Sequence, residues 1–281
     1  MKSYKEFIYL TRHAGLFYST YYLLHKVILK VNNSKTIKSY KKIRSEWLSK
    51  IFNHLFVFEN KVLNIDGKEL CKLTGTDKTF NEIYIRPLTS DTDVYSQVLK
   101  NKDYAPVAEI YNQLFTEKPT LIVDLGANIG LTSIYFSELY SGVTIKAFEP
   151  FFDNAEMTKL NFKANNVHPH SILHGGIWNR NAKLRLNRTF RDGKEWAVNL
   201  IEDKEGEIQG FCLKELIDSF NQTVDILKID IEGAEKKLFE IPEYAKAFLS
   251  KTKCVVLEIH DEFECRQLIY DAFEASNYFH Y

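Results

Sequence analysis

From residue 119 onward, short apolar runs alternate with stretches in which apolar residues recur every three or four positions. The short runs predict buried strands, and the longer spacing predicts amphipathic helices. The expected strands are 120–126, 143–150, 171–178, 224–230 and 254–261, and the expected helices are 129–140, 154–166 and 261–276. This alternation favours a parallel sheet with helices on both faces. Between the third and fourth of these strands, 183–213 is expected to form an antiparallel excursion.

The chain before residue 119 has a different pattern. Residues 1–52 put apolar side chains at helical spacing and predict a helical N-terminal arm. Residues 53–86 read as short strands separated by Asn, Asp and Gly turns. A capped helix is expected over 89–101, with Ser90 or Asp91 at its start. We therefore predict three parts: the arm, a small β-rich lead-in over 53–118 that covers the site, and an α/β domain over 119–281.

The composition places the chain among ordinary globular proteins. Of its 281 residues, 45% are hydrophobic and 26% are charged, which excludes disordered, collagen-like and coiled-coil classes. The formal net charge is zero, which argues against a nucleic-acid partner for the whole chain. The first fifty residues, however, hold nine Lys and two Arg against two Glu. A basic arm is thus joined to an acidic body.

Two readings of the arm stay open. A basic, aromatic-rich amphipathic helix suits peripheral contact with a membrane through residues 1–50. The same residues also suit a cap on the catalytic domain or a homodimer contact. No secretory signal and no uncharged apolar run of about 18 residues is present. The four cysteines form no CxxC pair, so we expect a reduced, cytoplasmic protein.

Polar residues and glycines gather where two of the predicted strands end. The first strand runs into Asp124, Gly126, Asn128 and Gly130, and the second ends at Glu149, 23 residues after Gly126. Glycines allow a tight turn and close approach of the backbone to a ligand. A carboxylate at the end of the second strand is placed to accept hydrogen bonds from ribose hydroxyls. These positions predict a nucleoside cofactor.

The spacing of the glycines bears on which cofactor binds. A dinucleotide site typically shows GxGxxG, whereas here Gly126 and Gly130 are four apart and Asp124 lies beside them. A carboxylate at this place would repel a pyrophosphate but would suit an ammonium and a sulfonium. This favours S-adenosylmethionine (SAM), with S-adenosylhomocysteine (SAH) as product, over NAD.

Several strings resemble the FkbM family of SAM-dependent methyltransferases. They are IVDLGANIGLTSIYF, AFEP, VDILKIDIEGAEKKLF, VVLEIHD and the upstream IRPLTSDTDVYSQVLKNKDY, and they span roughly residues 82–265. The resemblance implies a Rossmann-like class I methyltransferase sheet. It also implies O-methylation of a hydroxyl, commonly on a sugar, a glycan or a related natural product.

The resemblance also implies roles for individual residues. Around the methionine half of SAM it places Asp124, Gly126, Asn128 and Gly130. At the ribose it places Glu149, with Pro150 beside it. At the adenine it places Gly175, Gly176 and Ile177, with Trp178 nearby. Asp230 would lie near the transferring methyl group, and Ser90 and Asp91 would close the site.

Transfer to a hydroxyl benefits from a positioned base. The candidates are His260, Asp230, Glu232 and Glu258. Glu258 and His260 are expected to share one strand face, as are Lys228, Asp230 and Glu232. His260 has the ordinary pKa best suited to neutral pH.

Each candidate also has a structural reading. His260 would pair with an acid, Glu232 would cap a helix beginning near Gly233, and Lys228 would be an ion-pair partner for Asp230 or Glu258. Asp230 would hold the methionine half of SAM instead of taking a proton.

Three further points complete the prediction. Nothing in transfer to an aliphatic hydroxyl requires a metal, and we assign none, although Asp230, Glu232, Glu258 and Asp261 could surround a hard cation. The resemblance implies a reversed strand pair at the end of this fold, but only NYFHY follows the last predicted helix, so we expect at most one short strand there. Either the sheet is incomplete at that edge or the 53–86 strands cover it.

The alternative functions are an NAD-linked oxidoreductase and a non-catalytic module that docks on a membrane or a partner.

Overall fold

The computed structural model describes residues 59–65, 67–74, 80–87, 89–168, 171–187 and 199–279. The predicted helical arm over 1–52 lies outside these residues. The chain divides between Val94 and Tyr95 into two compact units. The three predicted parts, 1–52, 53–118 and 119–281, stay a prediction. Residues 95–118 belong to the second unit, where Tyr111 of helix α4 (Ala105–Leu114) donates a hydrogen bond of 3.1 Å to Asp225.

The first unit contains a three-stranded antiparallel sheet. Its strands β1 (Glu59–Ile65), β2 (Lys68–Thr74) and β3 (Glu82–Ile85) pair in chain order. Helix α3 (Asp91–Tyr95) begins next and continues as one π-helical turn, η1 (Ser96–Lys100), so the predicted helix over 89–101 is confirmed. Arg86 fixes its start, because its guanidinium contacts both carboxylate oxygens of Asp91 at 2.7 and 2.9 Å.

The second unit is built on a five-stranded parallel sheet. Its order is β12-β11-β4-β5-β6, from β4 (Leu121–Leu125), β5 (Thr144–Glu149), β6 (Ile172–His174), β11 (Val224–Ile229) and β12 (Thr252–Leu257). Every residue of β4 and β11 is buried, as expected for strands covered on both faces. The predicted parallel sheet is thus confirmed.

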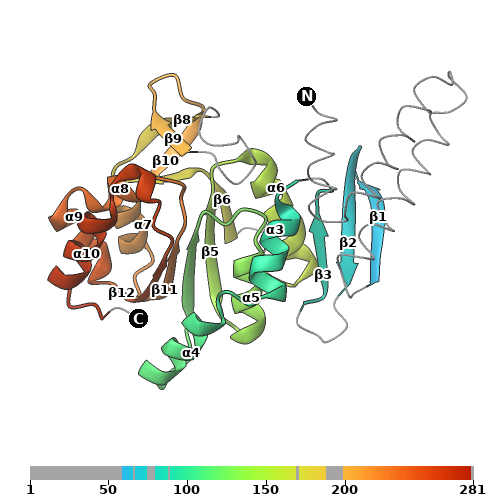
Figure 1. The fold of residues 1–281 in the computed structure, drawn as a ribbon, viewed down its shortest axis with the longest axis horizontal. Coiled ribbons are helices and arrows are strands. Elements are labelled where there is room, and N and C mark those ends of the chain that lie inside the picture. Colours follow the sequence, from blue (N-terminus) through green and yellow to red (C-terminus); the bar gives the residue numbers. More distant parts are fainter. Residues whose placement is uncertain are drawn as a thin grey trace, which may run out of the picture. The chain divides into compact units, whose positions relative to one another are not determined.

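Helices cover this sheet on opposite sides (Figure 1). On one side lie α5 (Leu131–Leu139) and α6 (Phe152–Ala164). On the other lie α7 (Leu213–Ser219), α8 (Glu235–Phe239), α9 (Pro242–Leu249) and α10 (Arg266–Ala275). The second group shares one core with the sheet, in which Leu227 and Ile229 pack with Phe248 and Ile269. Among the described residues, no helix is long and apolar enough to cross a membrane.

The strand predicted over 171–178 is two strands in different sheets. It bends at Gly175, and β7 (Gly176–Trp178) leaves to pair in parallel with β10 (Ile208–Cys212). The predicted single strand is therefore wrong. Gly175 fits the bend because a Cβ there would lie 2.4 Å from the Phe211 ring. The antiparallel excursion is confirmed by β8 (Ala182–Asn187) and β9 (Asn199–Glu202), which complete a sheet ordered β7-β10-β8-β9.

The described part of the chain adds no strand after α10, so the parallel sheet ends at β12. Instead of a strand, Tyr278 stacks on Phe273 with ring centroids 5.5 Å apart and donates a hydrogen bond of 3.0 Å to the Leu249 carbonyl. Strands β1–β3 form a sheet of their own and do not pair with β12. Among the described residues the parallel sheet is thus incomplete at this edge, as one of the two alternatives predicts.

Candidate active site

The carboxyl ends of β4 and β11 touch at Gly126. Its φ of +80° is a left-handed conformation, and a Cβ there would lie 1.8 Å from the carbonyl oxygen of Asp230. The Asp230 amide donates to the Leu125 carbonyl at 3.1 Å, which joins the two strand ends. No side chain larger than a hydrogen atom fits between them. The glycine therefore allows the two predicted polar segments to meet.

The loop after β4 is held by contacts from neighbouring elements. Gly130, with a φ of +84°, is the N-cap of α5, and a Cβ there would lie 2.8 Å from Thr158 of α6. Asn128 donates its amide to Glu149 at 2.8 Å, and its carbonyl accepts a bond of 2.6 Å from Thr158. The side-chain oxygen of Asn128 is buried and has no hydrogen-bond partner. The loop is thus shaped by β5 and α6 and leaves one buried acceptor unused.

Glu149 lies at the end of β5 and is 5% exposed. Its two carboxylate oxygens accept hydrogen bonds from the amides of Asn128 (2.8 Å) and Phe151 (2.9 Å). Burial raises the pKa of Glu149 to about 7, although these two amides act in the opposite direction. The carboxylate predicted to bind a ribose therefore also holds the glycine loop, and its ionisation is sensitive near neutral pH.

A partly exposed aromatic surface borders Glu149, and the sequence reading missed it. Phe152 is 57% exposed and meets the ring of His174 edge-on, with centroids 5.4 Å apart. A ring nitrogen of His174 lies 3.0 Å from the carbonyl oxygen of Pro150. His174 is the last residue of β6, and Phe152 lies three residues after the end of β5. The pair of Phe residues that follows AFEP was the available signal in the sequence.

Lys228 connects two carboxylates at the centre of the site. Its Nζ lies 3.4 Å from Asp124 and 3.3 Å from Asp230, and it donates a bond of 2.6 Å to the Gly126 carbonyl. Burial opposes its charged form, but Asp230 and Asp124 outweigh burial and raise the pKa of Lys228 above its ordinary value. A lysine held protonated in this way cannot act as a base. Its observed role is the predicted ion pair with Asp230.

Asp124 has one satisfied and one unsatisfied oxygen. The Ser133 hydroxyl donates to Oδ2 at 2.7 Å, whereas Oδ1 is buried and has no hydrogen-bond partner. Tyr104, which the sequence reading missed, is close enough to interact electrostatically with Lys228, Asp230 and Asp124. Burial is the main reason why the pKa of Tyr104 is raised. The polar side chains of Asp124, Lys228 and Asp230 thus lie together, next to the glycine loop.

His260 faces several carboxylates. Its Nδ1 lies 3.0 Å from Glu235, and its Nε2 lies 3.5 Å from Glu232, 4.0 Å from Asp230 and 3.9 Å from Glu258. His260 is 2% exposed, and Nε2 has no hydrogen-bond partner. The predicted candidates for a base are therefore together in space.

The reason why they meet differs from the predicted one. Strand β11 ends at Ile229 and β12 at Leu257, so Glu232, Glu258 and His260 lie beyond the strands and cannot share a strand face. The chain after β11 instead turns sharply, with a φ of +52° at Glu232 and +100° at Gly233. This turn returns Glu232 toward the segment that follows β12.

Glu235 was not among the predicted site residues. It is fully buried and accepts amide hydrogen bonds from Ile231 (2.9 Å) and Gly233 (2.7 Å). Glu235 therefore holds the turn that precedes α8, and the N-cap of this helix, Ala234, has no side-chain cap hydrogen bond. The second Glu, two residues after the Glu232-Gly233 pair, was the available signal in the sequence.

The charge around His260 changes its expected protonation. Burial lowers the pKa of His260, but the hydrogen bond to Glu235 and the charges of Glu235, Glu232 and Asp230 outweigh burial and raise it to about 9. The expectation of an ordinary pKa is thus wrong. In the ligand-free chain the ring is protonated at neutral pH.

The remaining predicted residues lie elsewhere. Asp261 points away to Arg266, which contacts both its carboxylate oxygens at 2.7 Å. Asp91, within the first unit, is paired with Arg86, and Ser90 is buried beside it. In β7, Ile177 and Trp178 are buried in the core, and a Cβ at Gly176 would lie 2.3 Å from Leu200. The proposed contacts of these residues with SAM stay predictions.

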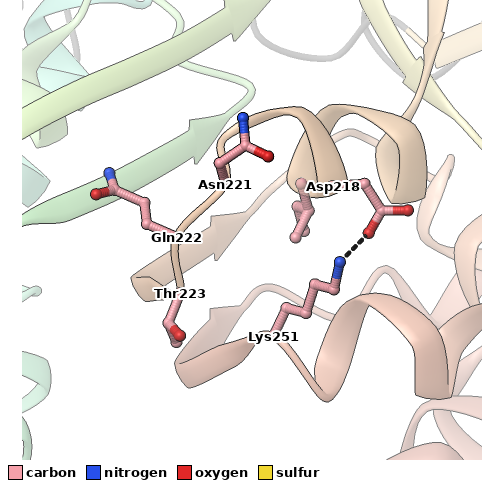
Figure 2. A pocket seen from close by; sticks show the side chains of 6 residues that line it. Asp218, Asn221, Gln222, Thr223 and Lys251 are labelled. Atoms are coloured by element: carbon pink, nitrogen blue, oxygen red, sulfur yellow. Dashed lines mark hydrogen bonds and ion pairs between the residues drawn. The ribbon is translucent and has the colours of Figure 1, made fainter.

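A surface hollow of about 260 Å³ lies at the other ends of the strands (Figure 2). Thr223 and Lys251, which line it, directly precede β11 and β12. Lys251 crosses the hollow to Asp218 at 2.6 Å. Ligands of open parallel sheets bind at the carboxyl ends of the strands, so this hollow is not the candidate site.

Known proteins resemble this chain in the region that carries the site. Residues 124–278 match the model of the methyltransferase FkbM domain. "Methyltransferase 1" of Beauveria bassiana (strain ARSEF 2860) is 26% identical over 174 residues, which cover 58% of this chain and 68% of that protein.

The solved structures that resemble this chain include two methyltransferases. Precorrin-6y C5,15-methyltransferase from Geobacter metallireducens GS-15 is 15% identical, with a TM-score of 0.33 over 59% of this chain and 68% of that one. A SAM-dependent methyltransferase from Agrobacterium tumefaciens is 12% identical, with a TM-score of 0.36 over 78% of this chain and 59% of that one. The family match spans more than half of the chain and includes Asp124, Glu149, Asp230 and His260. The chain therefore belongs to the FkbM family and is a SAM-dependent methyltransferase.

Proposed function

We propose that this enzyme transfers the methyl group of SAM to a hydroxyl oxygen of a small-molecule or glycan acceptor. The observation that carries the proposal is the grouping of His260, Asp230 and Glu232 next to the glycine loop. Asp230 belongs to both groups, because its carbonyl contacts Gly126 and its carboxylate faces His260. A cofactor bound on the loop would therefore have its reactive end close to polar groups that can bind a hydroxyl.

The residues of the loop fit SAM. The side-chain oxygen of Asn128 has no hydrogen-bond partner, and Oδ1 of Asp124 meets Lys228 at 3.4 Å without a hydrogen bond, so both oxygens can accept hydrogen bonds from an ammonium group. Glu149 has further lone pairs to accept hydrogen bonds from ribose hydroxyls, and the exposed ring of Phe152 beside it suits an adenine. SAM supplies a methyl group on sulfur that is already activated for displacement.

The acceptor side must align an oxygen and remove a proton. In the displacement a carbon–oxygen bond forms, the carbon–sulfur bond breaks and SAH leaves, while the hydroxyl proton passes to the enzyme. Because His260 is already protonated in the ligand-free chain, the carboxylates of Asp230 and Glu232 are the groups that can receive it. His260, 3.5 Å from Glu232 and 4.0 Å from Asp230, keeps these carboxylates ionised before the transfer and so ready to accept the proton.

Incubation of the protein with labelled SAM and a panel of sugars, glycans and hydroxylated natural products tests this. We expect label in an ether methyl group, identified by mass spectrometry and by its stability to base. Glu232→Gln should lower kcat by about 10²-fold or more, with the affinity for SAH unchanged. Asp261→Asn, which alters a neighbouring acid paired with Arg266, is the matched control and should keep full activity. Label only in a carboxyl ester or on nitrogen would refute the proposed acceptor chemistry.

A further inference from the structure

The strongest unused feature of the site is the Nε2 atom of His260. His260 is only 2% exposed, yet this nitrogen has no hydrogen-bond partner. A buried polar atom without a partner is costly and calls for a ligand. The Nε2 atom lies 3.5 Å from a Glu232 oxygen and 4.0 Å from an Asp230 oxygen.

We propose that Asp230, Glu232 and His260 bind a divalent transition-metal ion through one oxygen of each carboxylate and through Nε2 of a neutral His260, whose proton the ion displaces into solvent. These three ligand atoms all lie within 4.8 Å of one another. Ligand atoms about 2.1 Å from an ion are separated by roughly 3.0 to 3.4 Å in octahedral or tetrahedral geometry. The Glu232 oxygen is already near that distance from Nε2, and Asp230 needs only a small side-chain rotation.

The other ring nitrogen is arranged as in established metal sites. Nδ1 lies 3.0 Å from Glu235, a carboxylate that is itself fixed by the amides of Ile231 and Gly233. A histidine that ligates a metal almost always bonds a carboxylate or carbonyl through its second nitrogen, which orients the ring. Glu235 is thus a positioning residue that directs Nε2 toward the two acids.

The polar groups around the ion are compatible with this assignment. Lys228 approaches only the far oxygen of Asp230, Oδ2, at 3.3 Å, which leaves Oδ1 directed toward His260. Glu258 lies 3.9 Å from Nε2 with a side chain 67% exposed, so a small movement would bring a fourth ligand.

The donor set selects among metals. One imidazole and two or three carboxylate oxygens suit Mn²⁺, Fe²⁺, Co²⁺ or Zn²⁺, whereas Mg²⁺ prefers oxygen ligands alone. Three protein ligands leave coordination positions open for the acceptor. An acceptor hydroxyl bound there would lose its proton more readily and would be aligned for attack. This catalytic role rests on the proposed function, while binding of the ion does not.

Titration of the chelator-treated protein with Mn²⁺, followed by calorimetry and electron paramagnetic resonance, tests the site. We expect one bound ion per chain with the wild type. The Glu232→Gln and His260→Gln variants should each weaken binding at least 100-fold, and Glu235→Gln should weaken it 10- to 100-fold. The Asp261→Asn variant, one residue from His260 and paired with Arg266, should bind Mn²⁺ as the wild type does.

The affinity for SAH, measured on the same samples, shows that each variant is folded. A wild type that binds SAH but neither Mn²⁺ nor Zn²⁺ below millimolar concentration would overturn the metal site and leave the proposed function standing. Equal Mn²⁺ binding by Glu232→Gln and wild type would also overturn it. Specific Mn²⁺ binding without any methyl transfer to hydroxyl acceptors would support the site and count against the proposed function.

Discussion

The ionisation of Glu149 should make cofactor binding depend on pH. Its pKa of about 7 in the ligand-free chain means that the carboxyl is mostly protonated at pH 5.5 and mostly ionised at pH 8. Ribose hydroxyls donate to the ionised form, so binding of SAH selects that form. The ionised fraction changes about 30-fold between these two pH values, which corresponds to about 2 kcal/mol of binding free energy.

Calorimetric titration of SAH from pH 5.5 to pH 8 measures this effect. Affinity should rise by up to about tenfold per pH unit and level off above pH 7. His260, with a pKa of about 9, stays protonated over most of this range and does not contribute to the slope. The Glu149→Gln variant, which keeps the shape of the side chain, should bind weakly with no slope. A flat profile in the wild type, or the same slope in the variant, would refute the reasoning.

The same carboxyl group should affect stability without ligand. Because its pKa in the folded chain is raised from 4.5 to about 7, its contribution is fully present below pH 4.5 and is lost as the pH rises through 7. The free energy of unfolding of the wild type should fall by up to about 3 kcal/mol relative to Glu149→Gln across this window. Parallel urea denaturation of the two proteins measures the difference, and equal pH profiles would contradict it.

Two further predictions concern other parts of the second unit. Gly126→Ala places a Cβ 1.8 Å from the carbonyl oxygen of Asp230, so SAH should no longer raise the melting temperature of the protein. A rise in melting temperature as large as in the wild type would show that the strand ends do not touch. Asp225→Ala leaves the amides of Thr120 and Leu121 without their acceptor. It should lower the free energy of unfolding, measured by urea denaturation, by about 3 kcal/mol. A decrease below about 1 kcal/mol would count against this prediction. The pKa of Asp225, lowered to about 2, means that this contribution is lost only as the pH falls from 3.8 through 2.

The sequence predicted the parallel sheet because its strands are continuous apolar runs. All residues of β4 and β11 are buried, and a run without polar positions leaves few alternatives to a covered strand. The pattern failed at Gly175, where one apolar run changes sheets. Ile172 and Ile177 are buried on either side of the bend, so the apolar pattern alone did not mark the change of sheet. The Gly175-Gly176 pair at the bend was the available turn signal.

The site was predictable in its residues but not in its arrangement. Asp124, Glu149 and Asp230 lie at strand ends, where the fold brings them to one edge. The pairing of His260 with Glu235 depends on a left-handed turn at Glu232 and on β12 ending at Leu257. Those features decide where side chains point after a strand stops, and the alternation rule applies only within a strand. For the same reason Asp261 faces Arg266 instead of the acids.

The position of the cofactor is the central claim, and titration of SAH into two charge variants at pH 8 tests it most directly. Asp124→Asn keeps the shape of the side chain and removes the charge beside the glycine loop, whereas Lys251→Met removes a charge at the hollow at the opposite ends of the strands. The account predicts micromolar binding by the wild type, binding at least tenfold weaker by Asp124→Asn, and unchanged binding by Lys251→Met. Loss of binding only in Lys251→Met, or no SAH binding by a folded wild type, would contradict it.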